Sequence, residues 1–369
     1  KKALFLIREI FIEKSVQDHP RTLQFVQNLP LPIRIVEDAA SVYEIIGQSE
    51  DPEAAGKAIL YLTRNRGAFI RECPGTTHYT CCDYMILHVG TYCTMDCAYC
   101  VLQGYFHPPV LQYFVNHEDL ERELDAAFTR RDFRRIGTGE FTDSLLWERW
   151  TDMAGDLIVR FGKQDHMVLE LKTKTVLVDK LKHLDHNRKT IVSWSLNAPS
   201  VIRSNERGTA ALDSRIQAAI KCQTWGYPLA FHFDPLVIFE GGEAEYAGVV
   251  QRLFSEIDPS NVAWISLGSF RFPPHLKPII ERRFPSSLIA YGEFVAGLDG
   301  KQRYFKPLRI ACYEAIVREI KRYAPQTALY FCMEDESVWR RVMGFSPGDR
   351  GGLGRLLDDA CIRVCGLSA

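Results

Sequence analysis

From about residue 80 onward the chain repeats one pattern, a short apolar strand followed by a loop and an amphipathic helix. The candidate strands are YMILHVG, FRRIGTGE, MVLELKTK, TIVSWSLNA, PLAFHFDPL and NVAWISLGS. Candidate helices lie between them, near residues 117–131, 144–161, 178–186, 210–225, 243–257 and 274–284. Strand–helix units in such a succession predict an α/β fold whose parallel sheet is open or partly closed into a barrel.

The segments on either side of this repeat predict a different organisation. Residues 1–80 combine candidate strands in IREIFIEK and PIRIVED with candidate helices in AASVYEIIGQ and PEAAGKAILYLTRN. Residues 286–369 contain a candidate hairpin around Asp299-Gly300, then helices over 306–323 and 335–343 and a glycine-rich tail. We therefore expect an N-terminal mixed α/β region (1–80), a region of parallel strand–helix units that is open or partly closed into a barrel (81–285) and a C-terminal hairpin and helical region (286–369).

The charge and hydropathy pattern excludes several classes of protein. Lys and Arg total 45 and Asp and Glu total 46, so no field of the whole molecule attracts a polyanion, and such a partner must be held by a local patch. No stretch approaches about 18 uncharged apolar residues, and Arg8, Glu9 and Glu13 interrupt the first apolar segment. We expect a cytoplasmic protein without a membrane partner. The P-loop pattern G-x-x-x-x-G-K is missing from the sequence.

The cysteines are concentrated in one segment: six of the eleven lie between Cys73 and Cys100. Cys93, Cys97 and Cys100 form a C-x₃-C-x₂-C triplet directly after the first candidate barrel strand. Three thiolates on one loop can ligate three irons of a [4Fe–4S] cluster and leave the fourth iron open for S-adenosylmethionine (SAM). Zinc is the alternative, but structural zinc takes four protein ligands, usually from two Cys-x₂-Cys pairs, and this chain has no second pair.

These residues also carry a resemblance. The segment CTMDCAYC resembles the radical SAM superfamily. Further segments resemble the spore photoproduct lyase family within it, namely CPGTTHYTCCDY, YCTMDCAYCVLQGY, LKTK, SWSLNA, ERGTAALDSRIQAAIKCQTWGYPLAFHFDPL and LYFCMEDESVW. The resemblance implies a partial (β/α)₆ barrel of the radical SAM type and a C-terminal β-hairpin that touches DNA. It also implies a DNA-repair lyase whose 5′-deoxyadenosyl radical abstracts hydrogen from a thymine-dimer-type lesion. A cluster that must be reduced further implies a small electron-donor protein of the flavodoxin or ferredoxin type.

The resemblance assigns roles to individual residues. Cys93, Cys97 and Cys100 match the cluster ligands, and Tyr99 is assigned to cofactor binding and to catalysis. The matches to SAM-contacting positions are Thr138, Gly139, Glu140, Lys174 and Ser195. Most of these residues lie at the carboxyl ends of candidate barrel strands, where ligand contacts collect in such folds. A solvated lysine, a strand-end hydroxyl and a helix-capping acid remain alternative interpretations of Lys174, Ser195 and Glu140.

Two departures from the family concern the end of the reaction. The lyases return a hydrogen atom to the product radical from a cysteine. That cysteine lies in the segment that reads EFTDS here, and its best match in this chain is Phe141. They also carry a tyrosine after the third cluster cysteine, where this chain has Val101. Either Tyr99 or a cysteine such as Cys332 closes the cycle, or the substrate differs from a dimer.

The C-terminal hairpin alternates basic and aromatic residues, a combination that suits a nucleic-acid backbone with a base stacked beside it. We expect substrate contacts from Arg271, Lys301, Arg303, Tyr304 and Lys306. A solvated turn with packed aromatics, and an Arg271 paired with an acid, are the alternatives. Three functions follow: a radical SAM enzyme acting on a nucleic-acid lesion, the same chemistry on a nucleoside or other small molecule, or a non-catalytic DNA-binding iron–sulfur protein.

Overall fold

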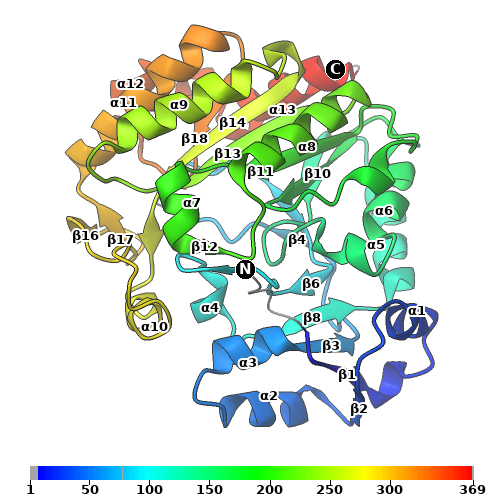
Figure 1. Ribbon diagram of the computed structural model, residues 1–369. Coiled ribbons are helices and arrows are strands. Elements are labelled where there is room, and N and C mark those ends of the chain that lie inside the picture. Colours follow the sequence, from blue (N-terminus) through cyan, green and yellow to red (C-terminus); the bar gives the residue numbers. More distant parts are fainter. Residues whose placement is uncertain (1–6, 77, 368–369) are drawn as a thin grey trace.

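The computed structural model, which describes residues 7–76 and 78–367, is built on an eight-stranded sheet of order β18-β14-β13-β11-β10-β9-β5-β4 (Figure 1). Neighbouring strands are parallel except β4 and β5. The strands are β4 (Ile70–Glu72), β5 (Met85–Leu87), β9 (Arg134–Gly137), β10 (Met167–Thr173), β11 (Thr190–Ser195), β13 (Leu229–Leu236), β14 (Val262–Ser269) and β18 (Ala328–Phe331). The expected parallel strands are confirmed and follow sequence order across the sheet, so the partial barrel is confirmed.

Helices cover the outer side of this curved sheet (Figure 1). Those that connect its strands include α5 (His117–Thr129), α6 (Met153–Phe161), α8 (Leu212–Thr224) and α9 (Gly242–Phe254). Helix α11 (Lys306–Tyr323) packs on α9, and α13 (Leu353–Cys365) packs on β14 and β18. Every residue of β11 and β14 is buried, as expected for parallel strands covered on both faces.

A second sheet, of order β2-β1-β3-β8-β6, combines three strands of the N-terminal region with two strands from residues 90–114. Its elements are β1 (Glu9–Glu13), α1 (Pro20–Asn28), β2 (Ile33–Val36), α2 (Ala39–Gly47), α3 (Pro52–Ala58), β3 (Ile59–Thr63), β6 (Gly90–Thr91) and β8 (Leu111–Phe114). The helix expected through residues 52–65 is wrong beyond Ala58, because Ile59–Thr63 form a strand between β1 and β8. A short run of consecutive apolar residues shows no hydrophobic periodicity, so its sequence does not distinguish a buried strand from a helix. Residues 1–6 of the expected first region lie outside the described residues.

The C-terminal region contains the expected hairpin, formed by β16 (Phe294–Ala296) and β17 (Gln302–Tyr304), with β15 (Arg271–Phe272) beside β17. Gly300 lies in its turn with φ +74°, a conformation that favours glycine. Helices α10 (Leu276–Arg283) and α12 (Glu336–Met343) confirm two more predictions. The helix expected over 178–186 is wrong, since only Asp179–Leu181 form a single 3₁₀ turn there. In the described parts of the chain, no helix has the length and apolar character needed to cross a membrane.

Candidate active site

A cavity of about 630 Å³ lies beside the carboxyl ends of the barrel strands. This volume is within the range of small-ligand pockets. Of the predicted site residues, the following line it: Cys93, Cys97, Tyr99, Cys100, Gly139, Glu140, Lys174, Ser195, Arg271 and Lys301. The structure therefore brings together residues spread over more than half of the chain. Thr138, Arg303, Tyr304 and Lys306 lie outside this lining.

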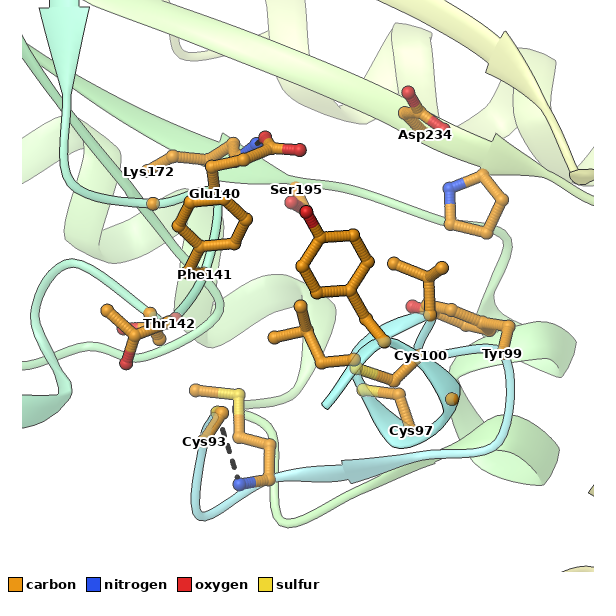
Figure 2. Close-up of a pocket in the computed structure, with 18 of the residues that line it drawn as sticks. Cys93, Cys97, Tyr99, Cys100, Glu140, Phe141, Thr142, Lys172, Ser195 and Asp234 are labelled. Carbon is orange, nitrogen blue, oxygen red and sulfur yellow. Dashed lines mark hydrogen bonds and ion pairs between the residues drawn. The ribbon is translucent and has the colours of Figure 1, made fainter. Parts of the chain in front are cut away.

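The cysteine triplet lies on a loop that is tied into the fold at several points. Tyr92, just before Cys93, has a left-handed backbone with φ +67°. Cys97 belongs to β7 (Asp96–Cys97), which pairs with β12 (Glu206–Arg207), and α4 (Leu102–Tyr105) begins shortly after Cys100. Figure 2 shows the three cysteines on one side of the cavity and Glu140, Lys172 and Asp234 on the opposite side.

The donor set of this loop fits an iron–sulfur cluster. Burial raises the pKa of the Cys93 thiol to about 12 and also raises that of Cys97, so thiolates at these positions require a positively charged partner. Within residues 7–76 and 78–367, no three Cys, His, Asp or Glu side chains converge closely enough to hold a single metal ion. A [4Fe–4S] cluster has a separate iron for each thiolate, so its ligands do not need to converge on one point.

Tyr99 is held in place by a buried ion pair that the sequence analysis did not identify. Its hydroxyl donates to the carboxylate of Glu206, which also accepts from the guanidinium of Arg215. The side chains of Glu206 and Arg215 are completely buried. Lys174 adds a cation 5.8 Å from the centre of the Tyr99 ring. Glu206 reaches the cysteine loop only because β12 pairs with β7, and no local sequence signal indicates that contact.

The segment after β9 approaches β10 closely. A Cβ atom at Gly139 would lie 2.8 Å from Cβ of Lys172, so only glycine fits without a shift of the backbone. Asp143 secures the same segment, because its carboxylate accepts from the Lys174 amide at 2.8 Å and from the Thr173 hydroxyl. Thr138 is buried, and its hydroxyl has no hydrogen-bond partner in the described structure. The segment thus lies beside Lys174 at the edge of the cavity.

Charged side chains opposite the cysteines form two ion pairs. Lys172 lies 3.8 Å from Glu140, and although burial opposes its charge, Glu140 and Glu170 raise its pKa. Arg271 lies 3.3 Å from Asp234 and donates to Sγ of Cys332 at 3.3 Å. Arg271 therefore both lines the cavity and pairs with an acid, so the two interpretations of it are compatible. Lys172 and Asp234 were missed, since only the barrel brings these strands together.

Phe141 occupies the wall of the cavity within a group of aromatic rings. Its side chain is 8% exposed, and its ring centre lies 4.9 Å from that of His88 and 5.7 Å from that of Tyr105. The position matched to a cysteine in the family is therefore an apolar packing position in this chain.

The hairpin requires a correction to the predicted substrate contacts. Arg303 is 1% exposed, and it pairs with Asp299 at 2.7 Å and donates to the Met333 carbonyl. Tyr304 is 3% exposed and stacks on Phe294 with ring centres 4.4 Å apart. Both residues hold the hairpin, and neither presents a surface to a ligand.

Two lysines of the hairpin region remain accessible. Lys301 lines the cavity, with 26% of its side chain exposed. Lys306 is exposed and lies 2.9 Å from Asp335, outside the cavity. Only Lys301 is therefore placed to contact a ligand inside the cavity.

Comparisons with known proteins agree with this geometry. The profile of the family described as spore photoproduct lyase matches residues 10–326. The spore photoproduct lyase of Bacillus subtilis is 27% identical over 329 residues, covering 86% of this chain and 94% of that protein. The enzyme of the same name from Clostridium acetobutylicum is 24% identical over 308 residues, covering 82% and 87%.

Solved structures share the fold. A spore photoproduct lyase complexed with dinucleoside spore photoproduct matches with a TM-score of 0.80 and 24% identity, covering 89% of this chain and 100% of that one. A variant with bound AdoMet and the same dinucleoside matches with a TM-score of 0.79. The family profile spans most of the chain, and the triplet, the cavity and the barrel agree with it. The chain belongs to the spore photoproduct lyase family.

Proposed function

We propose that this protein is a radical SAM enzyme that abstracts hydrogen from a thymine-dimer-type lesion in a nucleic acid. The observation that carries the proposal is the single cavity in which the cysteine triplet faces the predicted SAM residues, with Arg271 and Lys301 in the same lining. The dinucleoside spore photoproduct bound by a structural relative supports the choice of substrate.

The residues that line the cavity form two groups, one expected to hold the cofactors and one expected to face the substrate. When bound, the cluster and SAM supply a reductive cleavage that yields a hydrogen-abstracting radical. Cys93, Cys97 and Cys100 would hold the cluster, and Gly139, Glu140, Lys174 and Ser195, which belong to the same lining, would contact SAM. Tyr99 belongs to the same lining, and its hydrogen bond to Glu206 holds its side chain in place. An electron-donor protein of the flavodoxin or ferredoxin type completes the proposed system.

The opposite part of the cavity suits an anionic, partly apolar substrate. Arg271 and Lys301 provide positive charge, and Phe141 and Tyr105 provide apolar contact area. Beyond the cavity, Leu298 and Phe305 of the hairpin region are 72% and 48% exposed. Phe305, in place of the buried Tyr304, is the aromatic residue that can stack on a base, with Lys306 beside it for the phosphate backbone.

Cys332 is the better candidate for the closing hydrogen atom. The O–H of Tyr99 is donated to Glu206, whereas Sγ of Cys332 accepts from Arg271, a residue of the cavity lining. Burial raises the pKa of Cys332 to about 11, which keeps the proton on sulfur, as a hydrogen-atom donor requires. Transfer breaks the S–H bond of Cys332, forms a C–H bond on the product and leaves a sulfur radical. One electron from the proposed electron-donor protein and one proton from solvent would restore the thiol.

Anaerobic reconstitution tests the function directly. The assay measures 5′-deoxyadenosine with and without an oligonucleotide that contains the dimer. Release only with the lesion supports the proposal, whereas release that is unaffected by DNA indicates a nucleoside or other small-molecule substrate. No release under any condition indicates a non-catalytic iron–sulfur protein.

The hydrogen donor is tested with two variants and a control. Cys332→Ala should retain 5′-deoxyadenosine release but accumulate incompletely quenched products, whereas Tyr99→Phe should not change the product ratio. Cys81→Ala, at an exposed cysteine, is the matched control. An unchanged product ratio in Cys332→Ala would exclude Cys332 as the donor.

A further inference from the structure

Two buried side chains hold the backbone carbonyl groups of all three cysteines of the triplet. Nζ of Lys57 donates to the Cys93 carbonyl at 2.8 Å and also to that of Met95. Nε2 of Gln103 lies 3.2 Å from the Cys97 carbonyl and 3.3 Å from that of Cys100. The loop is thus held chiefly through its backbone carbonyl groups, while Sγ of Cys93 accepts from the Met95 amide at 3.3 Å.

Lys57 brings a positive charge to this loop from a distant part of the sequence. It lies in α3 of the N-terminal region, and it is completely buried. Its ammonium group also lies 3.9 Å from the centre of the Tyr92 ring. A buried ammonium group is costly unless its donors are satisfied, and two carbonyl groups and the face of the Tyr92 ring lie around Nζ.

The buried charges around the loop do not cancel. Asp96 lies 4.0 Å from Nζ of Lys57 and 3.0 Å from Nη1 of Arg283, and all three side chains are at most 3% exposed. Arg283 also donates to Oε1 of Gln103, which links the two halves of the anchor. Its other partner, Asp51, is 42% exposed and therefore screened by water. Among Lys57, Arg283 and Asp96, two cations and one anion leave a formal charge of +1 on this side of the cysteine loop.

We propose that Lys57 and Gln103 anchor the cluster loop through its carbonyl groups, and that the ammonium of Lys57 also favours the reduced state of the cluster. The inference rests on the proposed function, since it requires an iron–sulfur cluster on Cys93, Cys97 and Cys100. Reduction adds one negative charge to a cluster that is already surrounded by thiolates. A nearby buried cation stabilises the state with more negative charge, so Lys57 raises the reduction potential. Gln103 makes comparable hydrogen bonds but carries no charge, which makes it a natural control.

The test uses the full chain, reconstituted anaerobically, without SAM or DNA. Lys57→Met removes the donors and the charge, Lys57→Gln removes the charge and keeps a donor, and Gln103→Met removes neutral donors only. Iron and sulfide per chain and the midpoint potential, from a redox titration followed by electron paramagnetic resonance, are measured for each variant. Far-UV circular dichroism confirms that each variant is folded.

We expect both Lys57 variants to disfavour reduction about tenfold, which corresponds to a potential about 59 mV lower for a one-electron couple. Gln103→Met should lose iron faster to a chelator while its potential stays within about 20 mV of wild type, a twofold change in the equilibrium. A purely structural role for Lys57 would change iron retention but not the potential, so unchanged potentials in both Lys57 variants overturn the inference. If neither variant takes up iron, Lys57→Arg decides: iron uptake supports the proposal, and its failure overturns it. A wild-type chain without iron would instead refute the proposed function.

Discussion

The buried contact between Glu206, Arg215 and Tyr99 makes a quantitative prediction for Glu206→Gln. Removing one member of a buried ion pair costs about 3–5 kcal/mol, because the other charge is left without compensation. Arg215 retains the carbonyls of Ala210 at 2.8 Å and Ser195 at 2.9 Å, and glutamine retains one acceptor. We therefore expect the lower end of that range, about 3 kcal/mol of unfolding free energy.

The pH dependence of this loss gives a second measurement. Although burial opposes it, the charges of Arg215 and Lys174 lower the pKa of Glu206 from its ordinary value of 4.5. A carboxyl group with a lowered pKa stabilises the folded state above its unfolded pKa, and this contribution is lost as the pH falls through the folded value. The difference between wild type and Glu206→Gln should therefore be full at pH 7 and should shrink as the pH falls below 4.5.

The assay is anoxic urea denaturation, with SAM affinity measured on the folded variant. Glu256→Gln is the control, because it removes a carboxylate from an exposed i, i+4 pair with Arg252 and should cause no measurable change. Glu206→Gln should also weaken SAM binding, since Tyr99 loses its acceptor. A stability within about 0.5 kcal/mol of wild type would show that the pair does not hold the loop and would refute the reasoning.

Three further predictions concern the cavity. Gly139→Ala should lower SAM affinity at least tenfold without loss of iron, because the added Cβ would lie 2.8 Å from Cβ of Lys172. Calorimetry would measure the affinity, and an unchanged value would contradict the assignment of Gly139 to SAM binding. Phe141→Cys should increase the share of product that has regained its hydrogen atom. The loss of the ring should lower the free energy of unfolding by about 2–4 kcal/mol. An identical product ratio would show that a thiol at this position does not reach the product radical. Lys301→Ala should weaken binding of a lesion oligonucleotide and reduce the slope of log affinity against log salt by about 1, whereas Lys14→Ala, in an exposed N-terminal pair, should change neither. Equal salt slopes for the two lysine variants would exclude the phosphate contact.

Local sequence patterns were enough to predict the parallel strand–helix units, the hairpin and the cysteine triplet, whereas the partial closure of the sheet into a barrel was implied by the resemblance to the family. Strands such as Met167–Thr173 alternate with helices, and a parallel sheet is the usual way to bury such units. The triplet depends only on spacing within one loop. By contrast, β18 and α13 were missed, because one is four residues long and the other begins directly after two glycines.

The composition of the site depended on contacts between distant segments. Arg303 looked like a phosphate contact in the sequence, but its partners Asp299 and the Met333 carbonyl meet it only in the folded hairpin. Glu206, Lys57 and Asp234 carry no local signal, since each reaches the cavity or the cysteine loop through a strand pairing, a helix or a barrel strand elsewhere in the chain. The sequence alone therefore determined the fold class and the cluster motif, which depend on period and spacing. Only the tertiary structure decided which charges are buried beside the motif, because burial and pairing are properties of residues that are neighbours in space.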